Sequence, residues 1–347
     1  MKTLFSLVVL TLMLLAPGKG VAEIEDSRLF AARTASMKSM LRIIGSTDLA
    51  AMENVINAFQ SKYQGVAIKY DQAGSIDVYK AVELNAQNSI PYDLAISSAM
   101  DLQIKLVNDG FAQSYNSTQT DKLSSVMKWR NRVFGFTREP VVIVYNTEQI
   151  NPWSLPKTRF ALLEYLRENR AKFQNRLATY DVQRSGAGYL FASQDSLQSE
   201  TYWRLMEVFG DLSTRLSCCT SEMLDLIEKG ELMLAYNVVG SYAQARVSAG
   251  GSIGIHKLDD YTLVMNRSAL IPVNSGNLTE AGNFIDHLLS SAGQEAMDKD
   301  FGLMSTDALA ASATLTPIRM DPGLLVFLDR MKRQAFVDEW KSAIVNR

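Results

Sequence analysis

The chain carries, at residues 41–59, the sequence LRIIGSTDLAAMENVINAF. Residues 41–44 are mostly apolar and predict a short buried strand, which the GSTD segment at residues 45–48 ends. The apolar side chains that follow recur at the i, i+3, i+4, i+7 spacing of an amphipathic helix: Met52, Val55, Ile56 and Phe59. We expect Ser46 or Thr47 to cap that helix. A strand that leads directly into a helix is typical of an α/β fold.

The same pattern continues along the chain. Further strands are expected at 66–70, 92–96, 177–181, 232–237, 261–265 and 269–271, and helices near 75, 102–107, 160–166, 203–209 and 223–228. Strands that alternate with helices predict an α/β protein with mixed, mainly parallel sheets. In such sheets, ligands bind outside the carboxyl ends of the strands.

The length of 347 residues suggests about two domains of roughly 150 residues each. A β-rich stretch at residues 133–146 lies between them. We expect one lobe to comprise residues 40–135 and 262–347, and the other to comprise residues 140–258. A chain that leaves a lobe and returns to it makes two crossings, which form a hinge. The cleft between the lobes is then the natural place for a ligand.

Composition narrows the classes of function. The formal charge of −2 argues against a general nucleic-acid binder, which would be basic. The two histidines are His256 and His287, and the two cysteines, Cys218 and Cys219, are adjacent, so the paired spacing of a zinc site is absent. The sequence contains no HExxH motif. We expect no enzyme activity, no metal and no cofactor. In an oxidising compartment the cysteines could form a strained vicinal disulfide or remain free thiols.

The N-terminus has the pattern of a secretory signal peptide. Lys2 precedes an apolar run at residues 4–15, Pro17 and Gly18 break that run, and small residues at 20 and 22 suit cleavage near Ala22. The alternative is an uncleaved anchor, although the run is short for a bilayer span. We therefore expect a signal peptide at residues 1–22 and a soluble periplasmic protein. A polar lead-in at residues 23–39 follows, which we expect to be a frayed helix.

Hydroxyl side chains follow two expected strands of the first lobe. Ser46 and Thr47 come after one strand, and Ser97 and Ser98 come after another. Together with the free N–H groups of a helix N-terminus, these hydroxyls suit the oxygens of an anionic or hydroxylated ligand. The alternative is that all four residues only cap helices.

The second lobe offers matching candidates. Arg184, Ser185 and Gly186 follow a strand and open a Ser-Gly-x-Gly turn, which would aim N–H groups and one cation at an anion. The alternative is that the glycines serve backbone geometry alone. Asn237 and Ser241 follow the next strand and suit hydrogen bonds to an oxygen-rich ligand.

Arg138 lies in the first crossing between the lobes. Its guanidinium could bind a carboxylate or phosphate through two parallel hydrogen bonds. Alternatively, Arg138 could brace the hinge through an internal ion pair with a carboxylate.

Several motifs, in their order along the chain, resemble one family. They are DLAISS at 93–98, VYN at 144–146, YTLV at 261–264, ALIP at 269–272 and LSSAGQ at 289–294. This order is similar to that of the type 2 extracellular solute-binding proteins of ABC importers. Within that family the chain resembles the branch of ferric-binding, hexose-phosphate-binding and phosphoglycerate transport regulatory proteins. The tail at residues 317–340 is most like the phosphoglycerate regulatory type.

The resemblance implies a two-lobed, hinge-closing (Venus-flytrap) fold that binds a small anionic solute. The expected solute is a phosphorylated C3–C6 compound or a di- or tricarboxylate, delivered by a monomer to an ABC permease. An alternative implied by the regulatory type is a co-receptor that presents the solute to a membrane histidine kinase. Ferric iron is a second alternative, but ferric-binding relatives carry a tandem Tyr pair where this chain has Ser241 and Tyr242.

Overall fold

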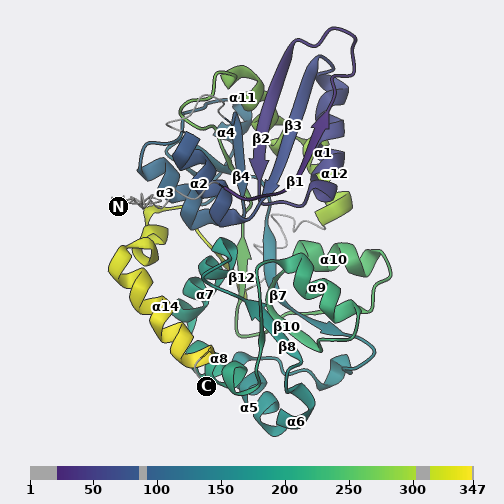
Figure 1. Cartoon of the computed structure of the whole chain (residues 1–347), viewed down its shortest axis with the longest axis vertical. Helices are drawn as coiled ribbons and strands as arrows, with labels where there is room; N and C mark the ends of the chain where they lie inside the picture. Colours follow the sequence, from purple (N-terminus) through teal and green to yellow (C-terminus); the bar gives the residue numbers. More distant parts are fainter. Residues whose placement is uncertain (1–21, 86–91, 302–312, 346–347) are drawn as a thin grey trace, which may run out of the picture.

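The computed structural model describes residues 22–85, 92–301 and 313–345. These residues form two lobes, one above the other in Figure 1, each built around a seven-stranded sheet with helices on its faces. The expected signal peptide lies almost entirely outside the described residues. None of the helices within the described ranges is long and apolar enough to span a membrane.

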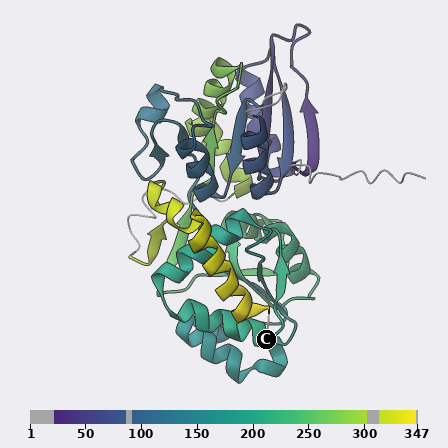
Figure 2. The same ribbon diagram turned by 60° about the vertical axis from the view of Figure 1, so that its left-hand side comes forward.

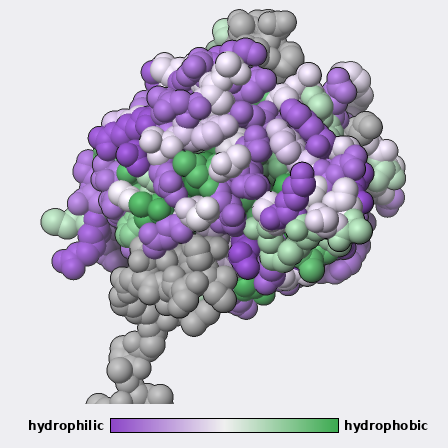
Figure 3. Space-filling model, turned by 90° about the horizontal axis from the view of Figure 1, so that it is seen from above, coloured by the Kyte–Doolittle hydropathy of each residue, from purple (hydrophilic) through white to green (hydrophobic). Residues whose placement is uncertain are grey.

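The first-lobe sheet has the strand order β1-β3-β2-β4-β13-β6-β5. Its strands are β1 (Ile24–Phe30), β2 (Ser39–Gly45), β3 (Val66–Ala73), β4 (Leu94–Ser97), β5 (Lys128–Trp129), β6 (Val133–Gly135) and β13 (Ser268–Leu270). Its helices are α1 (Leu49–Lys62), α2 (Ser75–Asn85), α3 (Met100–Asn108), α4 (Thr118–Asp121), α11 (Leu278–Leu289) and α12 (Ser291–Phe301). The outer end of this lobe is mostly hydrophilic, with apolar residues in small separate groups (Figure 3).

The second-lobe sheet has the order β14-β12-β7-β10-β8-β9, and β11 also pairs with β7. Its strands are β7 (Glu139–Asn146), β8 (Leu177–Tyr180), β9 (Arg215–Ser217), β10 (Leu234–Val239), β11 (Ile253–His256), β12 (Thr262–Met265) and β14 (Leu315–Pro317). The helical segments beside it are η1 (Pro152–Ser154), α5 (Arg159–Glu168), α6 (Arg170–Phe173), α7 (Gly186–Gln198), α8 (Thr201–Asp211), α9 (Thr220–Glu228) and α10 (Gly240–Ser248).

Parallel pairing is concentrated where strands alternate with helices. In the first lobe β2 pairs in parallel with β3 and β4, and in the second lobe β8 pairs in parallel with β9 and β10. The strands next to the crossings, β7 and β13, pair antiparallel with their neighbours. The mixed α/β fold with two lobes is confirmed.

The first part of the polar lead-in, Ile24–Phe30, is a strand and the rest is a loop, so the expected frayed helix is wrong. β1 pairs antiparallel with β3 along the edge of the first sheet, and Phe30 is its one buried side chain. An edge strand that is exposed on both faces needs no apolar alternation, because its backbone hydrogen bonds hold it in place. Its polar sequence therefore gave no periodic signal.

The two crossings lie side by side. β7 begins at Glu139 in the first crossing, and Glu139 and Pro140 pair with Met265 and Val264 at the end of β12. Residues 266–267 then lead back into β13 of the first lobe. The hinge therefore consists of two adjacent backbone segments.

The C-terminal segment contacts both lobes, whereas we expected residues 262–347 to lie in the first lobe. η2 (Pro322–Leu328) packs on α3 of the first lobe, and α14 (Arg330–Ile344) packs on α8 of the second. Figure 2 shows α14, in yellow, running down the side of the second lobe. Its buried face consists of Phe336, Val337, Trp340, Ala343 and Ile344. These apolar side chains join the second-lobe core and so fix the helix there.

Asp101, in the first turn of α3, is a buried carboxyl group whose Oδ1 has no hydrogen-bond partner among the described residues. Burial raises its pKa to about 7, although backbone hydrogen bonds and Arg333 of α14 act in the opposite direction. Between about pH 4 and pH 7 the folded protein therefore holds a proton on Asp101 that the unfolded chain has lost.

We predict that the free energy of unfolding falls as the pH rises from about 4 to about 7, and that Asp101→Asn flattens this dependence. Urea unfolding of wild type and Asp101→Asn at pH 5 and pH 8 measures this pH dependence. The matched control is Asp338→Asn, because Asp338 is exposed. If Asp101→Asn and wild type lost the same stability between these pH values, Asp101 would not be the responsible group.

Candidate functional site

A cleft of about 460 Å³ lies between the lobes. The first lobe contributes, among others, Glu25, Ser46, Asp48, Ser75, Lys80 and Ser98. The second contributes, among others, Arg184, Ser185, Cys218, Thr220, Ser221 and Tyr242. Arg267 reaches the cleft from the hinge. A volume of this size suits a small solute.

Four of the ten candidate residues line this cleft. Ser46 and Ser98 face each other, with their hydroxyl oxygens 3.3 Å apart, and the Ser98 backbone N–H donates to Ser46 Oγ. Arg184 is exposed within the cleft, and Ser185 caps α7 by accepting from the Gly188 N–H. The other six lie outside the cleft lining: Thr47, Ser97, Arg138, Gly186, Asn237 and Ser241.

The two first-lobe residues outside the lining have structural partners instead. Thr47 is buried, and its hydroxyl accepts a hydrogen bond from Arg267 Nη1 at 2.7 Å. Ser97 Oγ accepts from the backbone N–H of Ala99. The N-cap of α1 is Asp48, without a side-chain capping bond, so the expectation that Ser46 or Thr47 caps this helix is wrong. The helix begins at Leu49, so its N-cap position falls on Asp48, one residue after Thr47.

The hinge carries a buried ion pair that our sequence analysis missed. Arg267 Nε donates to Glu139 Oε1 at 2.8 Å, and the two side chains are 1% and 0% exposed. Burial disfavours the charge on Arg267, but Glu139 and Tyr242 together outweigh this effect and hold the pKa of Arg267 above its usual value. Ser241, expected in the site, donates to the same carboxylate. The pair therefore joins both crossings to both lobes.

Arg138 does not brace the hinge through an ion pair with a carboxylate, which was the alternative to its binding a ligand. It is half-buried, burial lowers its pKa, and it forms no ion pair within the described ranges. Arg267 takes the bracing role. One signal could have found it, because Arg267 is the only charged residue between Tyr261 and Pro272.

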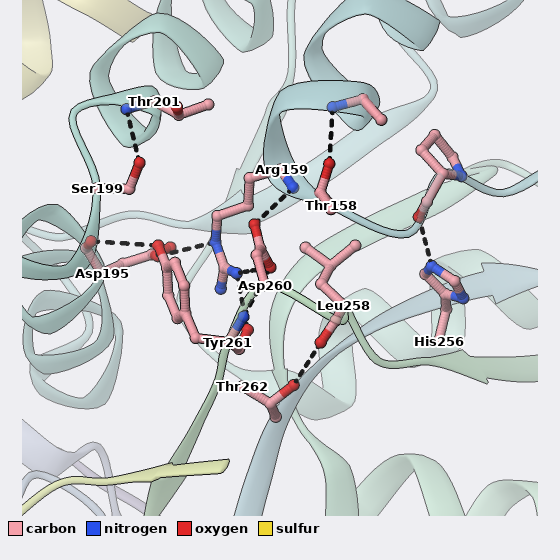
Figure 4. Close-up of polar contacts among 12 residues, drawn as sticks. Thr158, Arg159, Asp195, Ser199, Thr201, His256, Leu258, Asp260, Tyr261 and Thr262 are labelled. Atoms are coloured by element: carbon pink, nitrogen blue, oxygen red, sulfur yellow. Dashed lines mark hydrogen bonds and ion pairs between the residues drawn. The ribbon is translucent and has the colours of Figure 1, made fainter. Parts of the chain in front are cut away.

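Asn237 belongs to a buried polar network in the second lobe rather than to the cleft lining. Its backbone has a φ of 63°, and its side chain donates to Asp195 Oδ2 at 3.1 Å. Asp195 also accepts from the hydroxyls of Tyr236 and Tyr261 and forms an ion pair with Arg159. Figure 4 shows Arg159 between Asp195 and Asp260, with the Tyr261 ring against its guanidinium. The network links α5, α7, β10 and the approach to β12.

We predict that Asp195→Asn lowers the free energy of unfolding by about 2–3 kcal/mol, because an amide NH₂ would face donors that now share a carboxylate. Chemical denaturation measures this loss. The matched control is Asp211→Asn, whose ion pair with Arg170 lies at the surface. Equal losses in the two variants would contradict a special role for the buried network.

Contacts across the cleft hold the lobes together. Ser221 Oγ donates to Asp48 Oδ2 at 2.6 Å, and the Asp48 N–H donates to the Tyr242 hydroxyl at 3.1 Å. The Ala187 N–H at the start of α7 donates to Ser75 Oγ at the start of α2. Burial raises the pKa of Tyr242 to about 12, with Asp48 adding to the effect and Arg267 opposing it. Its hydroxyl therefore remains protonated at neutral pH.

Comparison with known proteins identifies the family. The family model of bacterial extracellular solute-binding proteins matches residues 41–303. The chain belongs to this family. Among solved structures, this solute-binding protein is similar to the substrate binding protein of the ABC transporter from Agrobacterium tumefaciens. The two are 29% identical, the match covers 93% of this chain and 99% of that chain, and the TM-score is 0.89.

More distant structures share the solute-binding protein fold. AfuA from Actinobacillus pleuropneumoniae, with fructose-6-phosphate bound, is 17% identical over 88% of this chain and 99% of that chain, with a TM-score of 0.71. Iron-bound HitA from Pseudomonas aeruginosa is 19% identical over 88% and 99%, with a TM-score of 0.68. No curated protein matches the chain.

Proposed function

We propose that this solute-binding protein captures a small anionic organic solute between its lobes in the periplasm and delivers it to an ABC permease. The solute class is a phosphorylated C3–C6 compound or a di- or tricarboxylate. The observation that carries the proposal is the convergence of the N-terminal ends of α2, α7 and α9 on one cleft, where Ser75, Ser185 and Thr220 lie in its wall beside Arg184. Free N–H groups and the positive end of a helix dipole both favour an anion.

The charges of the two walls differ, which orients the solute. The first-lobe wall carries carboxylates, including Glu25 and Asp77, and Asp77 is paired with Lys80 at 3.0 Å. The second-lobe wall carries Arg184 and the N-termini of α7 and α9. The anionic group therefore binds at the second-lobe wall, while hydroxyl groups of the solute donate to the carboxylates opposite.

Ferric iron fits the cleft less well. A phenolate ligand requires loss of the Tyr242 proton, and burial makes that loss harder. The neighbouring position is Ser241, which is buried and donates to Glu139. Because Fe(III) relies on anionic oxygen ligands, the organic anion is the better candidate. The similarity to iron-bound HitA supports the shared fold, not the ligand.

Delivery to a permease fits the membership of the family and the similarity to an ABC transporter component. The sensor-kinase alternative rests on the resemblance of the tail alone. In the structure that tail packs α14 onto the second lobe, where its buried residues fill the core. The permease is therefore the partner we propose.

A thermal-shift panel tests the solute class. It contains phosphoglycerate, phosphoenolpyruvate, fructose 6-phosphate, citrate, inorganic phosphate and ferric citrate, with fructose and glycerol as uncharged analogues. A bound solute at about 100 times its Kd adds about 2.7 kcal/mol to the free energy of unfolding, which shifts the Tm by several degrees. We expect an organic anion to shift it and its uncharged analogue not to. A shift with ferric citrate but not with citrate would overturn the proposal.

We predict that Arg184→Ala weakens binding of the stabilising anion by about 10- to 100-fold. A hydrogen bond to a charged group contributes about 1.5–3 kcal/mol, and each 1.4 kcal/mol is tenfold in affinity. The matched control is Arg167→Ala, because Arg167 is a surface arginine on α5 paired with Glu164. If both variants retained wild-type affinity, Arg184 would not contact the solute.

A further inference from the structure

The two cysteines of the chain lie together in the wall of the cleft. Cys218 follows β9, and Cys219 is the N-cap of α9 without a side-chain capping bond. Both are free thiols, and Cys219 is exposed. Glu222 lies one turn further along the chain, in the first turn of α9. The solute contacts proposed above use the N-terminus of α9 and Arg184 but none of these three side chains.

Their donor atoms are close to one another. Cys218 Sγ is 2.7 Å from Cys219 Sγ and 3.6 Å from Glu222 Oε2. The Cys218 backbone N–H donates to the same Oε2 at 3.2 Å, which holds the carboxylate beside the sulfurs. All three ligand atoms lie within 4.8 Å of one another, so a single ion can reach them all.

Adjacency favours chelation over a disulfide. Consecutive Cα atoms are about 3.8 Å apart, whereas disulfides usually join Cα atoms about 4.4–6.8 Å apart. A vicinal disulfide would therefore strain the backbone. An ion bound by both sulfurs lies between them, with metal–sulfur bonds of about 2.3 Å, so the two sulfurs stay further apart than in a disulfide. Rotation of the two thiol side chains is then enough to bind the ion, without a change in the backbone.

We propose that Cys218, Cys219 and Glu222 form a binding site for a thiophilic divalent cation such as Zn²⁺ or Cd²⁺. Two thiolates and one carboxylate are ligands that such ions accept. Three protein ligands leave a fourth coordination position open for water. The site differs from a structural zinc site, whose four protein ligands come from two separated pairs, and for that reason the sequence spacing did not indicate it.

Cadmium titration tests this site on the full, reduced and metal-free protein. We expect one Cd²⁺ per chain and a sulfur-to-cadmium charge-transfer absorption in the ultraviolet. Cys218→Ser and Cys219→Ser should each halve that absorption and weaken binding by about 100-fold, and Glu222→Gln by about tenfold. Glu164→Gln, which removes an exposed carboxylate on α5, should bind like wild type. Circular dichroism of each variant checks that it is folded.

Two results would overturn the site. One is unchanged Cd²⁺ affinity in the Cys218→Ser/Cys219→Ser double variant. The other is a protein that, as isolated, titrates no free thiols and has a mass two hydrogens below the reduced chain, which would identify a disulfide. Because the titration contains no organic anion, its outcome is independent of the proposed solute.

Discussion

Gly186→Val is expected to weaken binding of the stabilising anion by about tenfold to 100-fold and to hold the lobes apart. Gly186 is the first residue of α7, at the contact between the lobes. A Cβ there would lie 2.9 Å from Ser75 Oγ and 2.9 Å from Leu102 Cδ1, and 3.3 Å from Ala99 Cβ. All three atoms belong to the first lobe. Overpacking of this kind costs about 1–3 kcal/mol. Because the contacts lie between the lobes, the cost destabilises the closed arrangement of the lobes.

Small-angle scattering measures this effect directly. In the presence of the anion mixture of the thermal-shift panel, Gly186→Val should have a larger radius of gyration than wild type. The matched control is Gly276→Val, because a Cβ at Gly276 meets no atom within 4 Å. A Gly186→Val protein with the wild-type scattering curve and affinity would show that closure does not use this contact.

Glu139→Ala is expected to lower the free energy of unfolding by about 3–5 kcal/mol. The substitution leaves the Arg267 guanidinium buried and without its carboxylate, and an uncompensated buried charge has a cost of this size. It also removes the acceptor of Thr137 and Ser241. Urea unfolding measures the loss.

Two further variants separate the ion pair from other causes. Glu231→Ala breaks a surface pair with Arg215 and should cost about 0–1 kcal/mol. The double variant Glu139→Leu/Arg267→Met removes both charges and should recover much of the loss. If the double variant were less stable than Glu139→Ala, the buried charge would not be the cause.

The fold could be predicted from the sequence where periodicity is strong. The apolar spacing from Met52 to Phe59 predicted α1, which is buried along the same face. The strand β1 could not be predicted, because its stability comes from pairing with β3 and its side chains are exposed. The position of α14 on the second lobe could not be predicted either, because an apolar helix face does not specify which lobe it covers.

The candidate site could likewise be predicted from the sequence only in part. We selected Ser46, Ser98, Arg184 and Ser185 because each lies between a predicted strand and a predicted helix. All four line the cleft. This position in the sequence could not distinguish them from Thr47 and Ser241, whose hydroxyls turn to the buried pair at the hinge. Which side of a strand end faces the cleft depends on packing across both lobes, and that information is not local in the sequence.

Calorimetric titration of wild type and Arg184→Ala with phosphoglycerate, fructose 6-phosphate and citrate tests the central claim most directly. We predict saturable binding of one of these anions to wild type, no binding of fructose or glycerol, and a Kd about 10- to 100-fold higher for Arg184→Ala. Equal binding of the uncharged analogue, or unchanged affinity in Arg184→Ala, would contradict the claim that this cleft holds an organic anion against its second-lobe wall.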